Sequence, residues 1–140
     1  MNTKIFCAGI AALALLSTSA AFAQTKMKAE LTGAQEVPPV TTQGKGSADI
    51  TFDAASKQLS WTVNYSGLSG PATAAHFHGP AETGKNAGVA VPIPNQATSP
   101  VNGSATLTDA QAADLQAGRY YINIHTAANP GGEIRGQVTK

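Results

Sequence analysis

The sequence predicts a mostly β fold, an antiparallel Greek-key-like β-sandwich with one short helix. Apolar and polar residues alternate with a period of two in several short runs, which is typical of half-buried strands. Clusters of Gly, Pro, Asn and Ser separate these runs at the spacing of a sandwich. A length of 140 residues with 14 glycines and 8 prolines fits one modest domain.

The first 23 residues have the pattern of an export signal. Lys4 supplies the positive charge, residues 5–16 form a short apolar stretch, and residues 21–23 form a small-x-small cleavage site. We therefore expect a mature single domain over residues 24–140, exported to the periplasm or secreted after cleavage near Ala23.

Charge and cysteine content exclude several classes of protein. The nine Lys and Arg residues and eight Asp and Glu residues give a net charge of +1, and loss of Lys4 with the signal brings the mature charge to zero. No large cationic surface is available for nucleic acid, and no run is apolar for long enough to span a membrane. The only cysteine, Cys7, leaves with the signal, which excludes disulfides and thiolate metal sites from the mature domain.

The first predicted strand covers residues 28–32, and a hairpin follows it. Apolar side chains alternate along residues 48–53 and again along residues 59–65, and the polar link between these runs is short. The two strands can share one buried face, with Trp61 as a core anchor. Further strands are expected at residues 74–78, 88–93, 103–107, 120–126 and 134–138.

A single segment has the pattern of a helix, at residues 109–117. Thr108 is a suitable N-cap, Gln111 stands three residues later as in a capping box, and good helix formers follow. Gly118 is expected to end this helix.

The three histidines fall on two predicted strands, at phases that allow them to meet. His76 and His78 share one strand face, and His125 shares its face with Tyr121 and Asn123, away from the apolar side. A His-x-His pair plus a histidine from another strand can place three nitrogens around copper or zinc. The sequence therefore predicts a metal site at His76, His78 and His125.

A second interpretation of the same residues stays open at this point. His76 and His78 can be polar residues at a solvated strand edge, hydrogen-bonded to backbone, while His125 is buried for packing alone. A His-x-His pair arises often by chance, so the spacing does not separate the two interpretations.

The last predicted hairpin adds possible neighbours of the site. Glu133, Arg135 and Gln137 share a face opposite the row that contains Asn123 and His125. Asn123 or Glu133 can orient a histidine ring from behind, and Arg135 can attract an anion. The alternative is an exposed Glu133–Arg135 ion pair that stabilises the sheet by only about 0–1 kcal/mol.

The standard catalytic motifs are absent from the sequence. It has no G-x-S-x-G elbow, no H-E-x-x-H helix, no phosphate-binding G-x-x-x-x-G-K-[ST] loop and no dinucleotide-binding G-x-G-x-x-G. Hydrolase, kinase and dehydrogenase activities therefore have no support, and we assign no catalytic residue.

Several short motifs resemble those of the CHRD domain, the chordin-type module, in order along nearly the whole mature chain. They are LTG at 31–33, EVPPV at 36–40, Gly46, AHFHGP at 75–80, GRYYINIHT at 118–126 and PGGEIRG at 130–136. The resemblance implies an antiparallel β-sandwich in an exported protein. This family occurs both as repeated modules of extracellular developmental proteins and as stand-alone bacterial proteins, and the resemblance implies no single activity.

Three functions follow as hypotheses. The first is an exported protein that binds a metal ion at the three histidines, with copper favoured by the Irving–Williams order and zinc as a possibility. The second is a non-enzymatic recognition module with an extracellular or periplasmic protein partner. The third is a copper-only redox enzyme similar to Cu/Zn superoxide dismutase, although three histidines and no cysteine exclude the zinc subsite of that enzyme.

Overall fold

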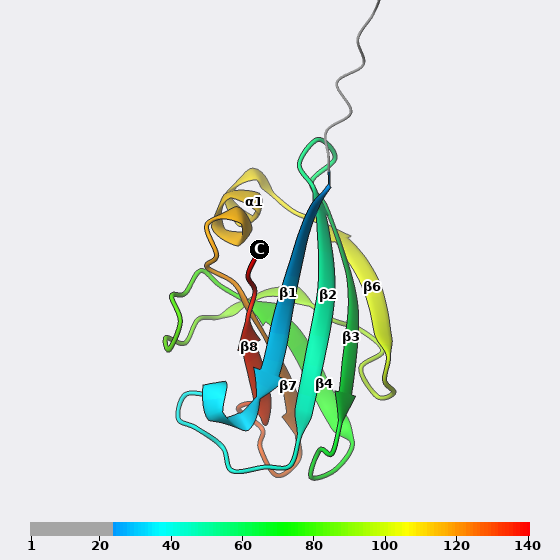
Figure 1. Ribbon diagram of the computed structural model, residues 1–140, viewed down its shortest axis with the longest axis vertical. Helices are drawn as coiled ribbons and strands as arrows, with labels where there is room; N and C mark the ends of the chain where they lie inside the picture. The colour runs from blue at the N-terminus through cyan, green and yellow to red at the C-terminus, as the bar shows by residue number, and fades with distance from the viewer. Residues whose placement is uncertain (1–23) are drawn as a thin grey trace, which may run out of the picture.

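The computed structural model describes residues 24–140, which form eight strands, a short 3-10 turn and one helix (Figure 1). The predicted export signal at 1–23, with Cys7, lies outside the described residues. The elements in chain order are β1 Thr25–Thr32, η1 Gly33–Gln35, β2 Lys45–Asp53, β3 Gln58–Ser66, β4 Ala72–His78, β5 Val89–Pro92, β6 Val101–Thr106, α1 Asp109–Gln116, β7 Tyr121–Thr126 and β8 Ile134–Gln137. The predicted mostly β fold class is confirmed.

All strands belong to one antiparallel sheet with the order β5-β4-β7-β8-β1-β2-β3-β6. The sheet folds over so that β1, β2, β3 and β6 form one layer and β4, β5, β7 and β8 form the other (Figure 1). The layers join along a narrow seam, where Thr32 pairs with Arg135 and Lys28 bridges to Thr139. The result is the predicted sandwich, built from a single curled sheet.

The apolar side chains of both layers meet in one core. Trp61 of β3 packs edge to face on Phe77 of β4, with ring centroids 5.2 Å apart, and so joins the two layers directly. Phe52, Trp61 and Ile122 are all buried, as the alternating pattern predicts. The core therefore forms from the inward side chains of the strands, without a covalent cross-link.

The predicted hairpin and helix both form. In β2 and β3 Ile50 pairs with Trp61, in register with the alternating apolar faces. In α1 the Thr108 side chain accepts from the Gln111 backbone N–H while the Gln111 side chain accepts from the Thr108 N–H, which completes the capping box. The helix ends at Gln116, and Gly118 follows with φ +75°.

Gly103 of β6 gives Trp61 the space it occupies in the core. The two residues are register partners, and a Cβ on Gly103 would lie 2.5 Å from Cζ2 of the indole. We expect Gly103→Ala to lower the free energy of unfolding by about 1–3 kcal/mol, because the indole must shift within a packed core. Urea denaturation measures this loss. The exposed Ser104→Ala on the same strand serves as control, and equal stability of both variants would contradict the prediction.

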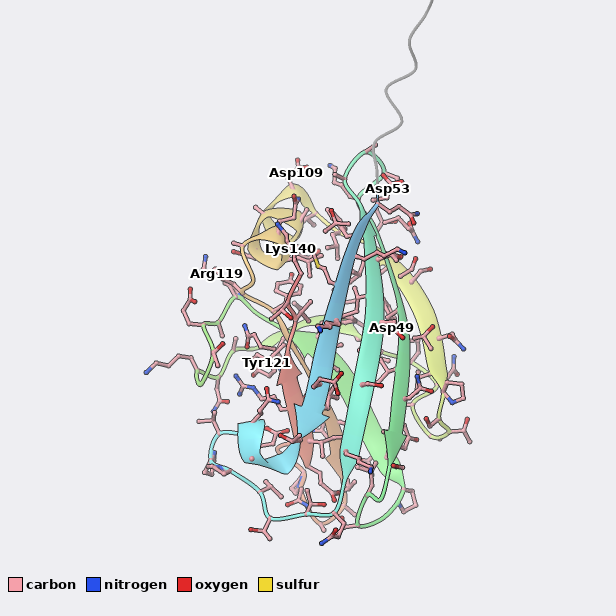
Figure 2. All side chains as sticks on the ribbon, in the orientation of Figure 1. Asp49, Asp53, Asp109, Arg119, Tyr121 and Lys140 are labelled. Carbon is pink, nitrogen blue, oxygen red and sulfur yellow. The ribbon has the colours of Figure 1, made fainter. Side chains whose placement is uncertain are left out.

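Charged side chains lie mostly on the outside of the sandwich. Asp49, Asp109 and Lys140 are exposed examples (Figure 2). Glu36, Glu133 and Arg135 are instead buried, together with His78 and His125. Within residues 24–140 we find no helix with the length and apolar character needed to cross a membrane.

Candidate metal centre

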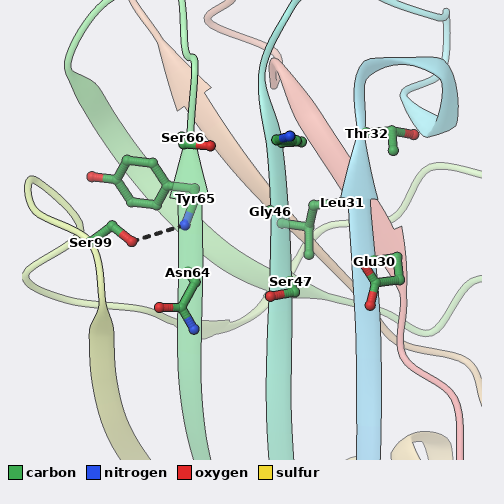
Figure 3. A pocket seen from close by; sticks show the side chains of 10 residues that line it. Glu30, Leu31, Thr32, Gly46, Ser47, Asn64, Tyr65, Ser66 and Ser99 are labelled. Carbon is green, nitrogen blue, oxygen red and sulfur yellow. Dashed lines mark hydrogen bonds between the residues drawn. The ribbon is translucent and has the colours of Figure 1, made fainter.

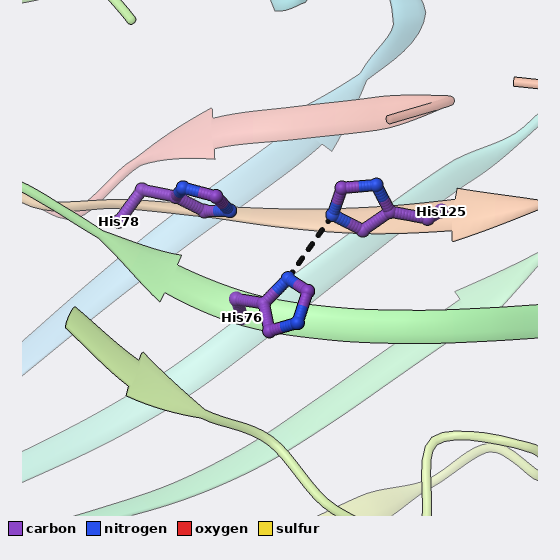
Figure 4. Close-up of side chains that lie close together, drawn as sticks. All are labelled: His76, His78 and His125. Atoms are coloured by element: carbon purple, nitrogen blue, oxygen red, sulfur yellow. Dashed lines mark hydrogen bonds between the residues drawn. The ribbon is translucent and has the colours of Figure 1, made fainter. Parts of the chain in front are cut away.

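The outer face of β4 and β7 carries the three histidines side by side. The register places His76 opposite Asn123, His78 opposite Tyr121, and His125 opposite Ala74. One ring nitrogen from each histidine lies within 4.8 Å of the others (Figure 4). The two strands therefore bring together the three residues that the sequence predicts, and these three could hold a metal ion.

Backbone carbonyls hold two of the rings in a defined tautomer. The Nδ1 of His78 lies 2.9 Å from the carbonyl oxygen of Ala87, and the Nδ1 of His125 lies 2.9 Å from that of Pro130. A carbonyl oxygen only accepts hydrogen bonds, so both Nδ1 atoms carry the proton and donate. In the neutral form of either ring the lone pair therefore lies on Nε2, which is the form that binds metals.

The ring nitrogens that do not bind a backbone carbonyl are the ones that a metal ion would bind. Nε2 of His78 is buried and has no hydrogen-bond partner within the described part of the chain. Nε2 of His125 accepts a hydrogen bond from Nδ1 of His76 at 3.1 Å (Figure 4). An ion between the rings would satisfy the buried lone pair of His78 and replace the hydrogen bond between the other two.

The local electrostatics favour neutral rings. Burial lowers the pKa of His76 below its ordinary value of 6.5, and the neighbouring His125 and His78 lower it further. Burial also lowers the pKa of His78, although the Ala87 carbonyl opposes this change by accepting from the ring. Because protonated imidazole cannot bind a metal, these shifts keep both rings in the ligand form at neutral pH.

An aromatic stack stands behind His78. The Tyr121 ring lies parallel to the His78 ring, at an interplanar angle of 2° and a centroid distance of 4.9 Å. On the other face of Tyr121, the Arg135 guanidinium carbon lies 3.4 Å from the ring centroid, in cation-π contact. His78, Tyr121 and Arg135 thus form three layers, which we call the ligand stack.

Arg135 is buried and held by the loop before β5. Only 2% of the residue is exposed, and its guanidinium donates to the side-chain oxygen of Asn86 at 2.8 Å and to the backbone oxygen of Lys85. It forms no ion pair with Glu133 among the described residues. The expectation of an exposed ion pair between these two residues is therefore wrong. The sequence places Arg135 on the correct face but does not show that loops cover it.

Glu133 is also buried, and it binds hydroxyl groups rather than a histidine. Its carboxylate accepts from the hydroxyls of Thr42, Ser69 and Thr126 and from the backbone N–H of Ser69, at 2.5–2.9 Å. Burial opposes ionisation, but these four hydrogen bonds outweigh it and lower the pKa of Glu133 to about 2. Glu133 thus joins two loops to the end of β7, next to His125.

Asn123 and Glu36 lie on the same face as the histidines. The Asn123 amide donates to the Gly131 carbonyl at 3.4 Å, and its oxygen is buried without a partner in the described chain, as is one carboxyl oxygen of Glu36. Burial raises the pKa of Glu36 to about 7, opposed by the charge of Arg135 and by a hydrogen bond from Asn123. Gly132 is required here, since a Cβ at that position would lie 2.4 Å from the orphan oxygen of Glu36.

A separate hollow of about 580 Å³ lies on the outer face of β1, β2 and β3 (Figure 3). Glu30, Lys45, Asn64 and Tyr65 line part of it, and the Tyr65 N–H donates to the Ser99 hydroxyl at 2.9 Å. None of the three histidines lines this hollow. The concentration of buried polar groups is instead at the histidine site.

Comparison with known families agrees with the motifs. A family model described as CHRD domain matches residues 27–138, which include all three histidines as well as Asn123, Glu133 and Arg135. Neither the curated proteins nor the solved structures contain a match to this chain.

Proposed function

We propose that this chain, which belongs to the CHRD domain family, is an exported protein that binds one transition-metal ion, with copper preferred. The ligands are His76, His78 and His125. One observation carries the proposal: the Ala87 carbonyl orients His78 so that its Nε2 lone pair is buried next to two other imidazoles, without any partner in the described chain. A buried acceptor of this kind is costly unless something binds it.

The chemistry of the ligands supports copper over other ions. Imidazole nitrogen suits copper and zinc, whereas carboxylate and carbonyl oxygens suit magnesium and calcium. Residues 24–140 contain no cysteine, so no thiolate competes for the ion. Among divalent ions on the same nitrogen ligands, Cu²⁺ binds more tightly than Zn²⁺. Copper is therefore the first choice, and zinc the second.

Titration of the mature chain tests the proposal. Calorimetry should show one equivalent of Cu²⁺ per protein, and electron paramagnetic resonance should show nitrogen ligands. A competing titration with Zn²⁺ should give weaker binding at the same stoichiometry. The free amine of Gln24 and nearby backbone can also bind Cu²⁺, so an N-terminally acetylated chain is the control. If acetylation removes the binding, the proposal fails and a recognition module becomes the leading function.

Copper binding should weaken as the pH falls, because protonated imidazole has no lone pair to donate. An unperturbed histidine titrates near pH 6.5. Burial lowers the pKa of His76 and of His78, so both rings stay neutral to lower pH than free histidine. The midpoint of the loss should therefore lie below pH 6.5. Cu²⁺ titrations between pH 5 and 7.5 measure it, and a midpoint above pH 7 would contradict the expected protonation states.

The proposed export predicts the N-terminal residue of the mature protein. The positive charge, apolar run and small-x-small site within residues 1–23 favour cleavage after Ala23. Intact-mass measurement of the protein from the periplasm or the medium should give a chain that begins at Gln24. Recovery of the full 140-residue chain from the cytoplasm of the native host would refute the export signal.

A further inference from the structure

The ligand stack places a fixed positive charge close to the metal site. Arg135 lies 3.4 Å from the Tyr121 ring centroid, and that ring lies 4.9 Å from the ring of His78. Only one ring, that of Tyr121, therefore separates the guanidinium from the proposed metal ligand His78. Both Arg135 and His78 are buried, so water screens this charge little.

One short loop segment holds all three layers of the stack. The carbonyl of Ala87 accepts from Nδ1 of His78 and, at 3.2 Å, from the Tyr121 hydroxyl, which in turn accepts from the Ala87 N–H at 3.1 Å. The neighbouring Asn86 and Lys85 oxygens accept from Arg135. These hydrogen bonds prevent the Arg135 guanidinium from moving away when a copper ion binds at the histidines. The repulsion between the guanidinium and the metal ion is therefore retained.

Two buried acidic residues, Glu36 and Glu133, lie in the region of Arg135, and neither forms an ion pair with it in the described chain. The ionised carboxylate of Glu133 accepts its hydrogen bonds from hydroxyls and a backbone N–H rather than from the guanidinium. The charge of Arg135 acts on the carboxyl of Glu36 and lowers its pKa, against the larger effect of burial. Burial raises the pKa of Glu36 to about 7, so this carboxyl is only partly ionised at neutral pH. The histidine ligands add no negative charge to the site.

We propose that the fixed charge of Arg135 shifts the preference of this site from Cu²⁺ toward Cu⁺. The inference rests on the proposed copper function. Repulsion from a fixed cation grows in proportion to the charge of the bound ion, so Cu²⁺ is disfavoured about twice as strongly as Cu⁺. A unit charge at roughly 10 Å in a protein of effective dielectric about 20 changes the ratio of the two affinities by about tenfold.

Affinity measurements for both ions test this inference. Competition with bicinchoninate under a reductant gives the dissociation constant of Cu⁺, and competition with nitrilotriacetate gives that of Cu²⁺. Arg135→Gln should lower the preference for Cu⁺ by about tenfold. Arg135→Lys keeps the charge and should retain most of the preference, although it loses the planar stacking on Tyr121.

Two more variants separate the charge effect from damage to the fold. Glu36→Gln removes the carboxylate beside Arg135, so at pH 8 it should raise the preference for Cu⁺, opposite to the effect of Arg135→Gln. Arg119→Gln removes the same charge from a half-exposed residue paired with Asp114, and should leave the ratio unchanged (Figure 2). Circular dichroism confirms that each variant is folded. A general loss of structure would not shift the ratio of the Cu⁺ and Cu²⁺ affinities in opposite directions in Arg135→Gln and Glu36→Gln.

The failures of the two proposals can be told apart. If the wild-type chain binds copper at the histidines but neither Arg135→Gln nor Glu36→Gln changes the ratio of affinities, the inference about Arg135 is overturned and the metal site stands. The same holds if Arg135→Gln and Arg119→Gln shift the ratio equally. If the wild-type chain binds neither ion at the histidines, the proposed function fails and takes the inference with it.

Discussion

Replacing His78 by Ala should weaken Cu²⁺ binding by roughly a hundredfold or more. Loss of a residue that only supports a metal ligand typically costs 10–100-fold in affinity, and loss of the ligand itself should cost at least as much. Among the three proposed ligands, His78 has the lone pair that the fold prepares most completely, because the Ala87 carbonyl fixes its tautomer and its Nε2 is buried without a partner in the described chain. The triple replacement of His76, His78 and His125 should abolish binding at this site.

The control for these variants is a change of similar size far from the histidines. Asp49→Ala alters an exposed side chain of β2 and should bind copper like the wild type. Calorimetry measures all four proteins, and thermal unfolding without metal checks that they fold. The histidines face away from the hydrophobic core, so cooperative unfolding should be retained. Equal copper binding by the wild type and the triple variant would show that the ligands lie elsewhere.

The face that carries the histidines could be predicted, because strand side chains alternate strictly. His76 and His78 must lie on one side of β4, and Tyr121, Asn123 and His125 on one side of β7. Pairing of β4 with β7 could not be predicted, since β5, β6 and α1 lie between them in the sequence. Adjacency of the two histidine rows therefore depends on long-range topology, which alternation does not encode.

The groups that surround the histidines come from the backbone and from loops. The alternating strand pattern does not predict the positions of such groups. Any residue type can supply a carbonyl, so Ala87 and Pro130 carry no signal as partners of the histidines. Glu36 is a single carboxyl residue in the EVPP segment, and that isolation among apolar residues is its only hint of burial. Strand alternation places Arg135 on the correct face, but the loop that buries it through Asn86 lies outside any strand pattern.

Glu133→Gln should lower the free energy of unfolding by about 3 kcal/mol at pH 7. The carboxylate accepts four hydrogen bonds, from the hydroxyls of Thr42, Ser69 and Thr126 and from a backbone N–H of Ser69. These bonds lower its pKa from 4.5 to about 2, and each pKa unit corresponds to about 1.4 kcal/mol of preference for the charged form. An amide keeps the shape of the side chain but offers one acceptor oxygen, so it leaves buried donors unpaired.

Because of the Glu133 carboxylate, the free energy of unfolding should decrease as the pH falls. The folded pKa of this carboxyl lies below its unfolded value, so its contribution is fully present above about pH 4.5 and is lost as the pH falls toward 2. The difference in stability between the wild type and Glu133→Gln should therefore shrink over that range. Urea denaturation at several pH values measures it, with the exposed Glu30→Gln as control. If the difference stayed constant from pH 5 to pH 2, ionisation of Glu133 would not be the source of its stabilising effect.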